Sequence, residues 1–96
     1  MILPEDPFVR ELLPEFVDTW IQDINSQFDD LIKNQNSDEL YRLGHTVKGS
    51  CLQFGLDDIA AFGIELMGYA KANDWQKAEP MKSILLNAFQ EIRKIL

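Results

Sequence analysis

The chain is poor in the residues from which most catalytic and metal centres are built. Its 96 residues include one histidine and one cysteine, which are too few for a usual transition-metal site. The lone Cys51 cannot form an internal disulfide. No apolar run approaches the roughly 18 residues that a membrane span requires. We therefore expect no metal site of its own and no membrane insertion.

Basic residues are also scarce, because 9 lysines and arginines stand against 16 acidic residues, for a formal charge of −7. Such a surface repels a phosphate backbone, so nucleic acid is not an expected partner. The N-terminal residues lack the basic start and the long apolar stretch of a secretory signal. Together these features predict a soluble, cytoplasmic, monomeric protein, with residues 1–96 forming a single domain.

Apolar residues recur at spacings of three and four almost throughout, which predicts helices and no sheet. A short first helix is expected to begin at Asp6 as the N-cap, with Pro7 in its first turn, and to end at Pro14. A second helix should then run over residues 14–33. Its expected apolar stripe consists of Val17, Trp20, Ile21, Ile24, Phe28 and Leu31.

Three further helices complete the predicted fold. One spans residues 36–54, capped by Asn36 or Ser37 and stopped by Gly55. The next starts near Asp57 and Asp58 and ends before Asn73, and Asp74 caps a last helix that Pro80 is expected to bend. The inward residues of the last helix are Ala78, Met81, Leu85, Ala88, Phe89, Ile92 and Ile95. Short connections then predict an all-α fold, an antiparallel up-down-up-down four-helix bundle with an additional short N-terminal helix.

The histidine, His45, is predicted to face solvent. At about 100° per residue, an apolar stripe falls between about 160° and 240° from it, formed by Leu40, Leu43, Val47, Cys51 and Phe54. The residues within about 60° of the histidine are Tyr41, Lys48, Gly49 and Leu52. This outward face is unusual because it combines an aromatic residue, a leucine and a glycine.

Glycine at positions 44 and 49 costs the predicted helix roughly 1 kcal/mol each relative to alanine. Close approach of another molecule is one reason to retain them. Each feature also has an ordinary explanation. A lone surface histidine is usually a solvated side chain, Lys48 can pair with a nearby acid, and Tyr41 can pack along the neighbouring helix.

The sequence around the histidine reads His45-Thr46-Val47-Lys48-Gly49-Ser50, followed by Phe54-Gly55-Leu56 and Ile59. This pattern resembles the signature of histidine-containing phosphotransfer domains. The motif resemblance covers about residues 42–66, and the length and helical plan resemble the family's across the chain. It implies that His45 accepts a phosphoryl group from a receiver-domain aspartyl phosphate and passes it to another receiver.

The resemblance also assigns roles to neighbouring residues. It implies that Lys48 supports the phosphoryl group electrostatically, that Gly49 leaves an open approach beside the imidazole, and that small Ser50 belongs to the same crowded region. Receiver domains of hybrid sensor kinases and response regulators are the implied partners. Tyr41, Arg42 and Leu52 are the candidate partner-binding residues.

The chemistry is reasonable independently of the resemblance. Neutral imidazole is a good nucleophile near pH 7, and phosphoryl transfer depends chiefly on positioning and charge stabilisation. The receiver would have to supply its own carboxylates and Mg²⁺. We therefore expect a phosphoryl carrier without a cofactor of its own, and not a turnover enzyme.

One position departs from the family pattern. Many members have Glu or Gln on the following helix to hydrogen-bond the imidazole, and here that position is Met67, or Glu65 in a shifted register.

The alternative function is an adaptor that is never phosphorylated and binds a partner through the Tyr41, His45 and Leu52 face.

Overall fold

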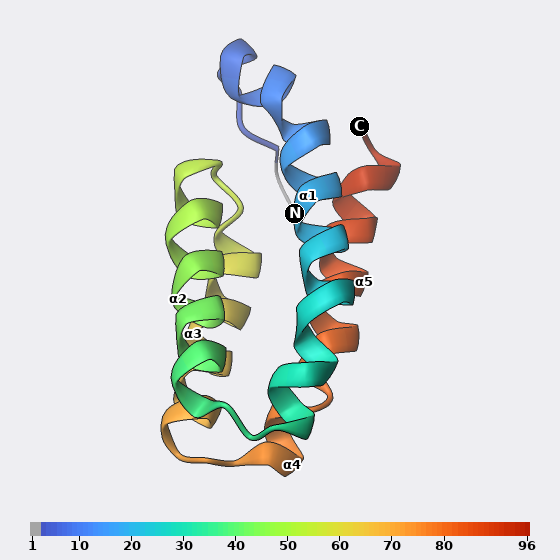
Figure 1. Ribbon diagram of the computed structural model, residues 1–96. Coiled ribbons are helices and arrows are strands. Elements are labelled where there is room, and N and C mark those ends of the chain that lie inside the picture. Colours follow the sequence, from blue (N-terminus) through green and yellow to red (C-terminus); the bar gives the residue numbers. More distant parts are fainter. Residues whose placement is uncertain (1–2) are drawn as a thin grey trace.

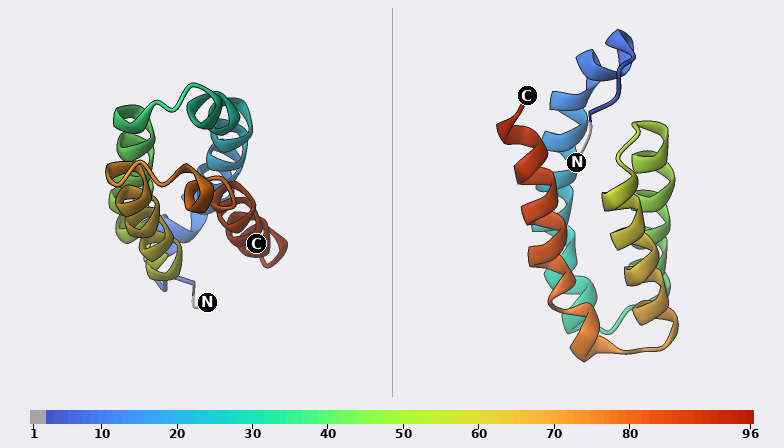
Figure 2. Two further views of the ribbon diagram at one scale, coloured as in Figure 1. Left: turned by 90° about the horizontal axis from the view of Figure 1, so that it is seen from below. Right: turned by 180° about the vertical axis from the view of Figure 1, so that it is seen from behind.

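The computed structural model describes residues 3–96, and every regular element among them is a helix. The elements are α1 (Pro7–Lys33), α2 (Ser37–Gln53), α3 (Asp57–Lys71), α4 (Trp75–Ala78) and α5 (Met81–Lys94). In Figures 1 and 2 each long helix runs opposite to the preceding one, and short α4 crosses the end between α3 and α5. The predicted all-α class is confirmed. No helix within residues 3–96 is long and apolar enough to cross a membrane.

The prediction of a separate short N-terminal helix is wrong, because α1 is continuous from Pro7 to Lys33 with Pro14 inside it. Proline removes one intrahelical hydrogen bond, but its fixed φ is compatible with a helix. Leu13 and Val17 flank the proline one turn apart and are both fully buried. Burial of both side chains in the same core keeps the two turns in line. The first turns of α1 extend past the α2–α3 turn (Figures 1 and 2).

Pro80 lies between two helices where one bent helix was predicted. The structure has two helices where one was expected, since α4 ends at Ala78 and α5 begins at Met81. Proline has no N–H to donate, so the ladder of hydrogen bonds is interrupted there. Glu79 and Pro80 nevertheless keep right-handed helical φ and ψ angles. The interruption lets α4 lie across the end of the bundle (Figure 1).

The predicted helix caps are confirmed. The side chains of Asp6, Asn36 and Asp74 accept hydrogen bonds from backbone N–H groups in the first turns of α1, α2 and α4. Gly55 ends α2 with a φ of 73°, a conformation that glycine adopts without strain. The amide of Leu56 donates to the Cys51 carbonyl at 2.8 Å, which closes a Schellman turn.

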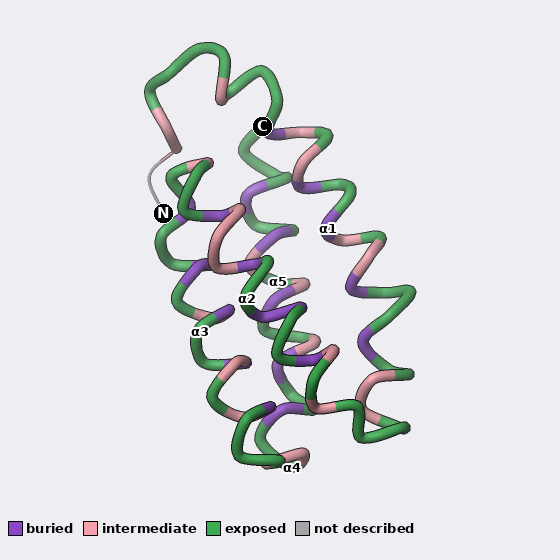
Figure 3. Tube along the Cα trace, turned by 60° about the vertical axis from the view of Figure 1, so that its left-hand side comes forward, coloured by how far each residue is buried: buried purple, intermediate pink, exposed green. Residues whose placement is uncertain are grey.

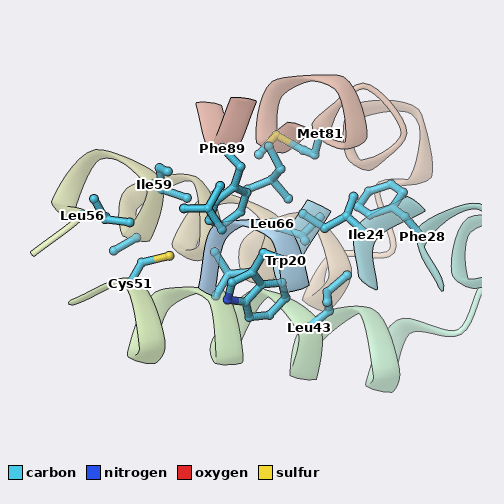
Figure 4. Close-up of a cluster of buried hydrophobic side chains, with 14 of the residues drawn as sticks. Trp20, Ile24, Phe28, Leu43, Cys51, Leu56, Ile59, Leu66, Met81 and Phe89 are labelled. Atoms are coloured by element: carbon cyan, nitrogen blue, oxygen red, sulfur yellow. The ribbon is translucent and has the colours of Figure 1, made fainter. Parts of the chain in front are cut away.

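The core lies between the helices and consists of the side chains that the apolar periodicity selects. Figure 4 shows residues from α1, α2, α3 and α5 converging on Trp20 and Phe89, whose rings stack with centroids 6.0 Å apart. Figure 3 shows the buried positions recurring along the helices at helical period. The predicted core residues that are only partly buried are Ile21, Leu31, Phe54 and Ala88. Ile95 is 58% exposed, so its assignment to the core is wrong.

α2 and α3 approach each other with backbone against backbone. An ideal Cβ built at Gly44 would lie 2.8 Å from the Gly63 carbonyl oxygen, and one at Gly63 would lie 2.7 Å from the Gly44 carbonyl oxygen. No side chain fits at either position while the helices keep this separation. Gly44 is therefore explained by the packing of α2 on α3. The close approach of another molecule, which the sequence analysis offered as one reason for this glycine, is not needed.

This contact yields a stability prediction. Gly44→Ala and Gly63→Ala should each destabilise the protein by about 1–3 kcal/mol, because the added methyl group must push the helices apart. Gly68→Ala is the matched control on α3, where a Cβ would meet nothing within 4 Å. That variant should gain about 0.5–1 kcal/mol from helix propensity. Urea midpoints at unchanged slope measure all three, and wild-type stability in Gly44→Ala would contradict the close contact.

Candidate functional site

His45 occupies the middle of α2 and its side chain is exposed. The residues on the opposite side of the helix, including Leu40, Val47 and Cys51, are fully buried. The predicted orientation of this helix is therefore confirmed. No hydrogen bond within residues 3–96 involves the imidazole. The ring meets solvent and is free to meet a reactant.

A shallow hollow lies on the N-terminal side of the histidine. Its volume is about 330 Å³, and Asp38, Tyr41, Arg42 and His45 line it. The guanidinium of Arg42 forms an exposed ion pair with Glu39 at 3.1 Å. Such exposed pairs contribute little to stability and break readily. Arg42 can therefore be recruited by an anionic partner, and Tyr41 offers an aromatic surface that is 39% exposed.

On the C-terminal side, Lys48 and Gly49 lie one turn from the histidine and Leu52 lies two turns away. Lys48 is half-buried, and its backbone nitrogen lies 2.8 Å from the position that a Cβ at Gly63 would occupy. None of the ion pairs within residues 3–96 includes Lys48. Gly49 faces open space, and Leu52 exposes 51% of its surface. The outward face thus combines a cation, a gap and an apolar side chain.

The polar residues that follow the histidine bond to their own helix. The Thr46 hydroxyl donates to the Arg42 carbonyl at 2.9 Å, and the Ser50 hydroxyl donates to the Thr46 carbonyl at 2.6 Å. These bonds turn both hydroxyl groups back along α2. Ser50 is half-buried.

The structure resolves the open question of register on α3. The Cγ of Met67 lies 3.0 Å from the Cβ position of Gly44, the residue before His45. Glu65 is exposed and lies about 200° around α3 from Gly63, on the side away from α2. Met67, and not Glu65, therefore packs against α2 at the residue before His45, and a methionine side chain cannot donate a hydrogen bond to the ring.

Two residues of α3 that the sequence analysis missed lie near this face. Lys71 lines a second shallow hollow with Ser37, Asp38, Tyr41 and Ala70, about 310 Å³ in volume. Ile64 is 55% exposed. Lys71 follows Ile64 by seven positions, or about two helical turns, which places both on one side of α3. A helical projection of residues 57–71 would have placed Ile64 and Lys71 on the same side of the helix. Only the packing of α3 on α2 shows that this side lies next to Tyr41.

Cys51 contributes to the core and not to the exposed face. Burial raises the pKa of its thiol to about 12, and a hydrogen bond with Ser50 lowers it only in part. The thiol is fully buried. A neutral, inaccessible thiol is inert as a nucleophile. No group of three or more metal-ligating side chains occurs within residues 3–96.

Comparison with known proteins gave one match. A family model described as Hpt domain matches residues 11–95. The match begins at Glu11, within α1, and includes α2, α3, α4 and α5 in full. No curated protein and no solved structure matched.

The state of Cys51 can be tested by pH. Its folded pKa lies above the unfolded value, so the stability it contributes is complete below about pH 9 and is lost as the pH rises from 9 towards 12. The urea midpoint of the wild type should therefore fall more steeply between pH 8 and 10.5 than that of Cys51→Ala. At pH 8 a thiol reagent should modify the protein only in urea. Rapid modification of the folded protein would contradict the burial.

Proposed function

The chain belongs to the Hpt domain family, and we propose that it carries a phosphoryl group on His45 between receiver domains. Domains of this family serve histidine phosphotransfer in two-component signalling. The observation that carries the proposal is the exposure of the chain's one histidine in the middle of α2, beside a glycine with open space around it. A large reactant group can reach the ring there without displacing any side chain of α2.

The proposed step is an in-line displacement at phosphorus. The unprotonated ring nitrogen of His45 attacks the phosphorus of an aspartyl phosphate as the bond from phosphorus to the carboxylate oxygen breaks. The receiver recovers its carboxylate, and the phosphoimidazolium that forms can release its N–H proton to water. Attack by the carboxylate of a second receiver reverses these bond changes. The receivers supply Mg²⁺ and the acidic residues that hold it.

Lys48 is proposed to stabilise charge on the transferring group. It lies one helical turn from His45, and no carboxylate of residues 3–96 pairs with its ammonium. A cation one turn from the ring can offset the negative charge of the phosphoryl oxygens during transfer. Arg42 is the other cation near the ring, and its exposed ion pair with Glu39 would have to open before it could contact the phosphoryl group.

The groups that each protein would supply are those expected of a phosphoryl carrier and its receiver. Members of the Hpt family generally carry phosphoryl groups and are not turnover catalysts. In this proposal the chain contributes the nucleophile and one cation, and the receiver contributes the metal. Tyr41, Arg42 and Leu52 surround the histidine and would contact the receiver.

The alternative is a helical adaptor whose histidine is never phosphorylated. The exposure of Tyr41 and Leu52 favours docking in either case. The two functions differ only at the imidazole, so phosphorylation decides between them.

A substitution of the nucleophile tests the proposal directly. Wild-type protein incubated with labelled, phosphorylated receiver and Mg²⁺ should acquire label that is lost in acid and survives base, as phosphohistidine does. His45→Gln should acquire none and keep its helical circular dichroism and urea midpoint, because the side chain makes no contact with the core. Label on the variant, or none on the wild type with any receiver tested, would reject the mechanism.

The open space at Gly49 gives a second test. Gly49→Gln should raise stability by several tenths of a kcal/mol, since glutamine is the better helix former. Its bulk should slow transfer on the order of 100-fold, because a displacement of even about 1 Å from in-line geometry has that effect. Gly49→Ala is the control, expected to gain stability while losing less of the rate. Equal transfer rates in wild type and Gly49→Gln would mean that this glycine does not serve access.

A further inference from the structure

The face that carries His45 continues across the helix boundary onto α3. The hollow beside Tyr41 has Ser37 and Asp38 on α2 as one wall and Ala70 and Lys71 on α3 as the other. Tyr41 also lines the hollow of His45. The aromatic ring therefore separates two depressions, one beside the histidine and one beside Lys71.

Ile64 extends this surface alongside the histidine. It follows Gly63, whose Cβ position is 2.8 Å from the backbone nitrogen of Lys48, so it lies at the level of the turn after His45. It shares its side of α3 with Lys71, two turns away. More than half of its surface meets solvent. The exposed apolar residues nearest the histidine are thus Tyr41, Leu52 and Ile64, and one of them belongs to α3.

The opposite flank of α2, which faces α1, carries different charges. A groove there has a volume of about 230 Å³ and is lined by Trp20, Asp23, Gln27, Leu31, Glu39, Arg42, Leu43 and Thr46. Its charged side chains are two carboxylates and Arg42, which is paired with one of them. The exposed apolar residues of α1, Phe8 and Leu12, are about two turns and one turn beyond the level of Phe16, which stacks on Phe54 at the end of α2.

The two flanks therefore differ in charge next to the histidine. The α3 flank carries the cations Lys48 and Lys71 against one carboxylate, Asp38, together with apolar Ile64. The α1 flank carries the carboxylates of Asp23 and Glu39 against one cation, Arg42. Asp57 and Asp58 of α3 lie in its first turn, at the far end from Lys71. A receiver's phosphorylation pocket is built from carboxylates and brings a phosphoryl group, so an acidic rim around it suits the α3 flank.

We propose that the phosphorylated receiver docks across α2 and α3, with Ile64 and Lys71 as its contacts on α3. This inference rests on the proposed function of His45. Ile64 fits an apolar side chain of the receiver, and Lys71 pairs with an acidic residue at the edge of its phosphorylation pocket. The contacts on α3 hold the receiver and take no part in the bond changes at His45.

The test compares two leucine-sized residues of almost equal exposure. Ile64 on α3 is 55% exposed and Leu12 on α1 is 56% exposed. Ile64→Ala should raise the half-saturating concentration of phosphorylated receiver about tenfold and leave the maximal transfer rate unchanged. Leu12→Ala should change neither quantity. Urea midpoints establish that both variants remain folded.

A second pair of variants tests charge. Lys71 and Lys94 are each in the last turn of their helices, α3 and α5. Lys71→Glu should raise the half-saturating receiver concentration at low salt, with the difference from wild type shrinking as salt screens the pair. Lys94→Glu should behave as wild type, because it makes the same change of net charge at the last turn of another helix.

The outcomes separate the two levels of the proposal. A wild type that takes label from no receiver fails the proposed function itself. A wild type that is phosphorylated normally, with Ile64→Ala and Lys71→Glu unimpaired, overturns docking on α3 and leaves His45 as the carrier. Impairment by Leu12→Ala in place of Ile64→Ala would move the receiver to the α1 flank and overturn the inference in the same way.

Discussion

The backbone contact between Gly44 and Gly63 is the constraint on which the candidate site depends. Carbonyl oxygens of the two helices occupy the space that side chains would need, so α2 and α3 lie closer than ordinary packing allows. His45 directly follows Gly44, and Ile64 directly follows Gly63. The same contact therefore sets the position of His45 relative to α3 and brings the outward side of α3 next to the histidine. Separating the helices would move both surfaces at once.

The glycines of α2 and α3 illustrate how far sequence can go. Gly44 and Gly49 look alike in the sequence, since each weakens a helix by about the same amount. The structure gives them different reasons, because Gly44 meets backbone atoms of α3 whereas Gly49 meets nothing within 4 Å. Which glycine faces a neighbouring helix depends on where that helix packs. A periodicity within one segment does not contain this information.

Features set by a few neighbouring residues are predictable from the sequence, whereas several that depend on how the helices pack are not. The caps at Asp6, Asn36 and Asp74 and the turn at Gly55 follow from side-chain chemistry over a few residues, and the outward direction of His45 follows from helical rotation. The sequence predicts a helix end at Pro14 because the cost of a proline is local, whereas the burial of Leu13 and Val17 that offsets it is tertiary. Lys71 was missed for the same reason, since its neighbour Tyr41 is 30 positions away in sequence.

The charge around His45 differs from the average charge of the surface. The net charge of −7 is a property of the whole surface, and at separations beyond the Debye length of about 8 Å it is largely screened. What acts on a transferring phosphoryl group is the charge within that distance. Three cations, Lys48, Arg42 and Lys71, lie around His45 and Tyr41, together with the carboxylates of Asp38 and Glu39. In the proposed complex this small local excess of cations would lower the repulsion between the site and a phosphorylated pocket, while the acidic remainder of the surface would disfavour other orientations of the same partner.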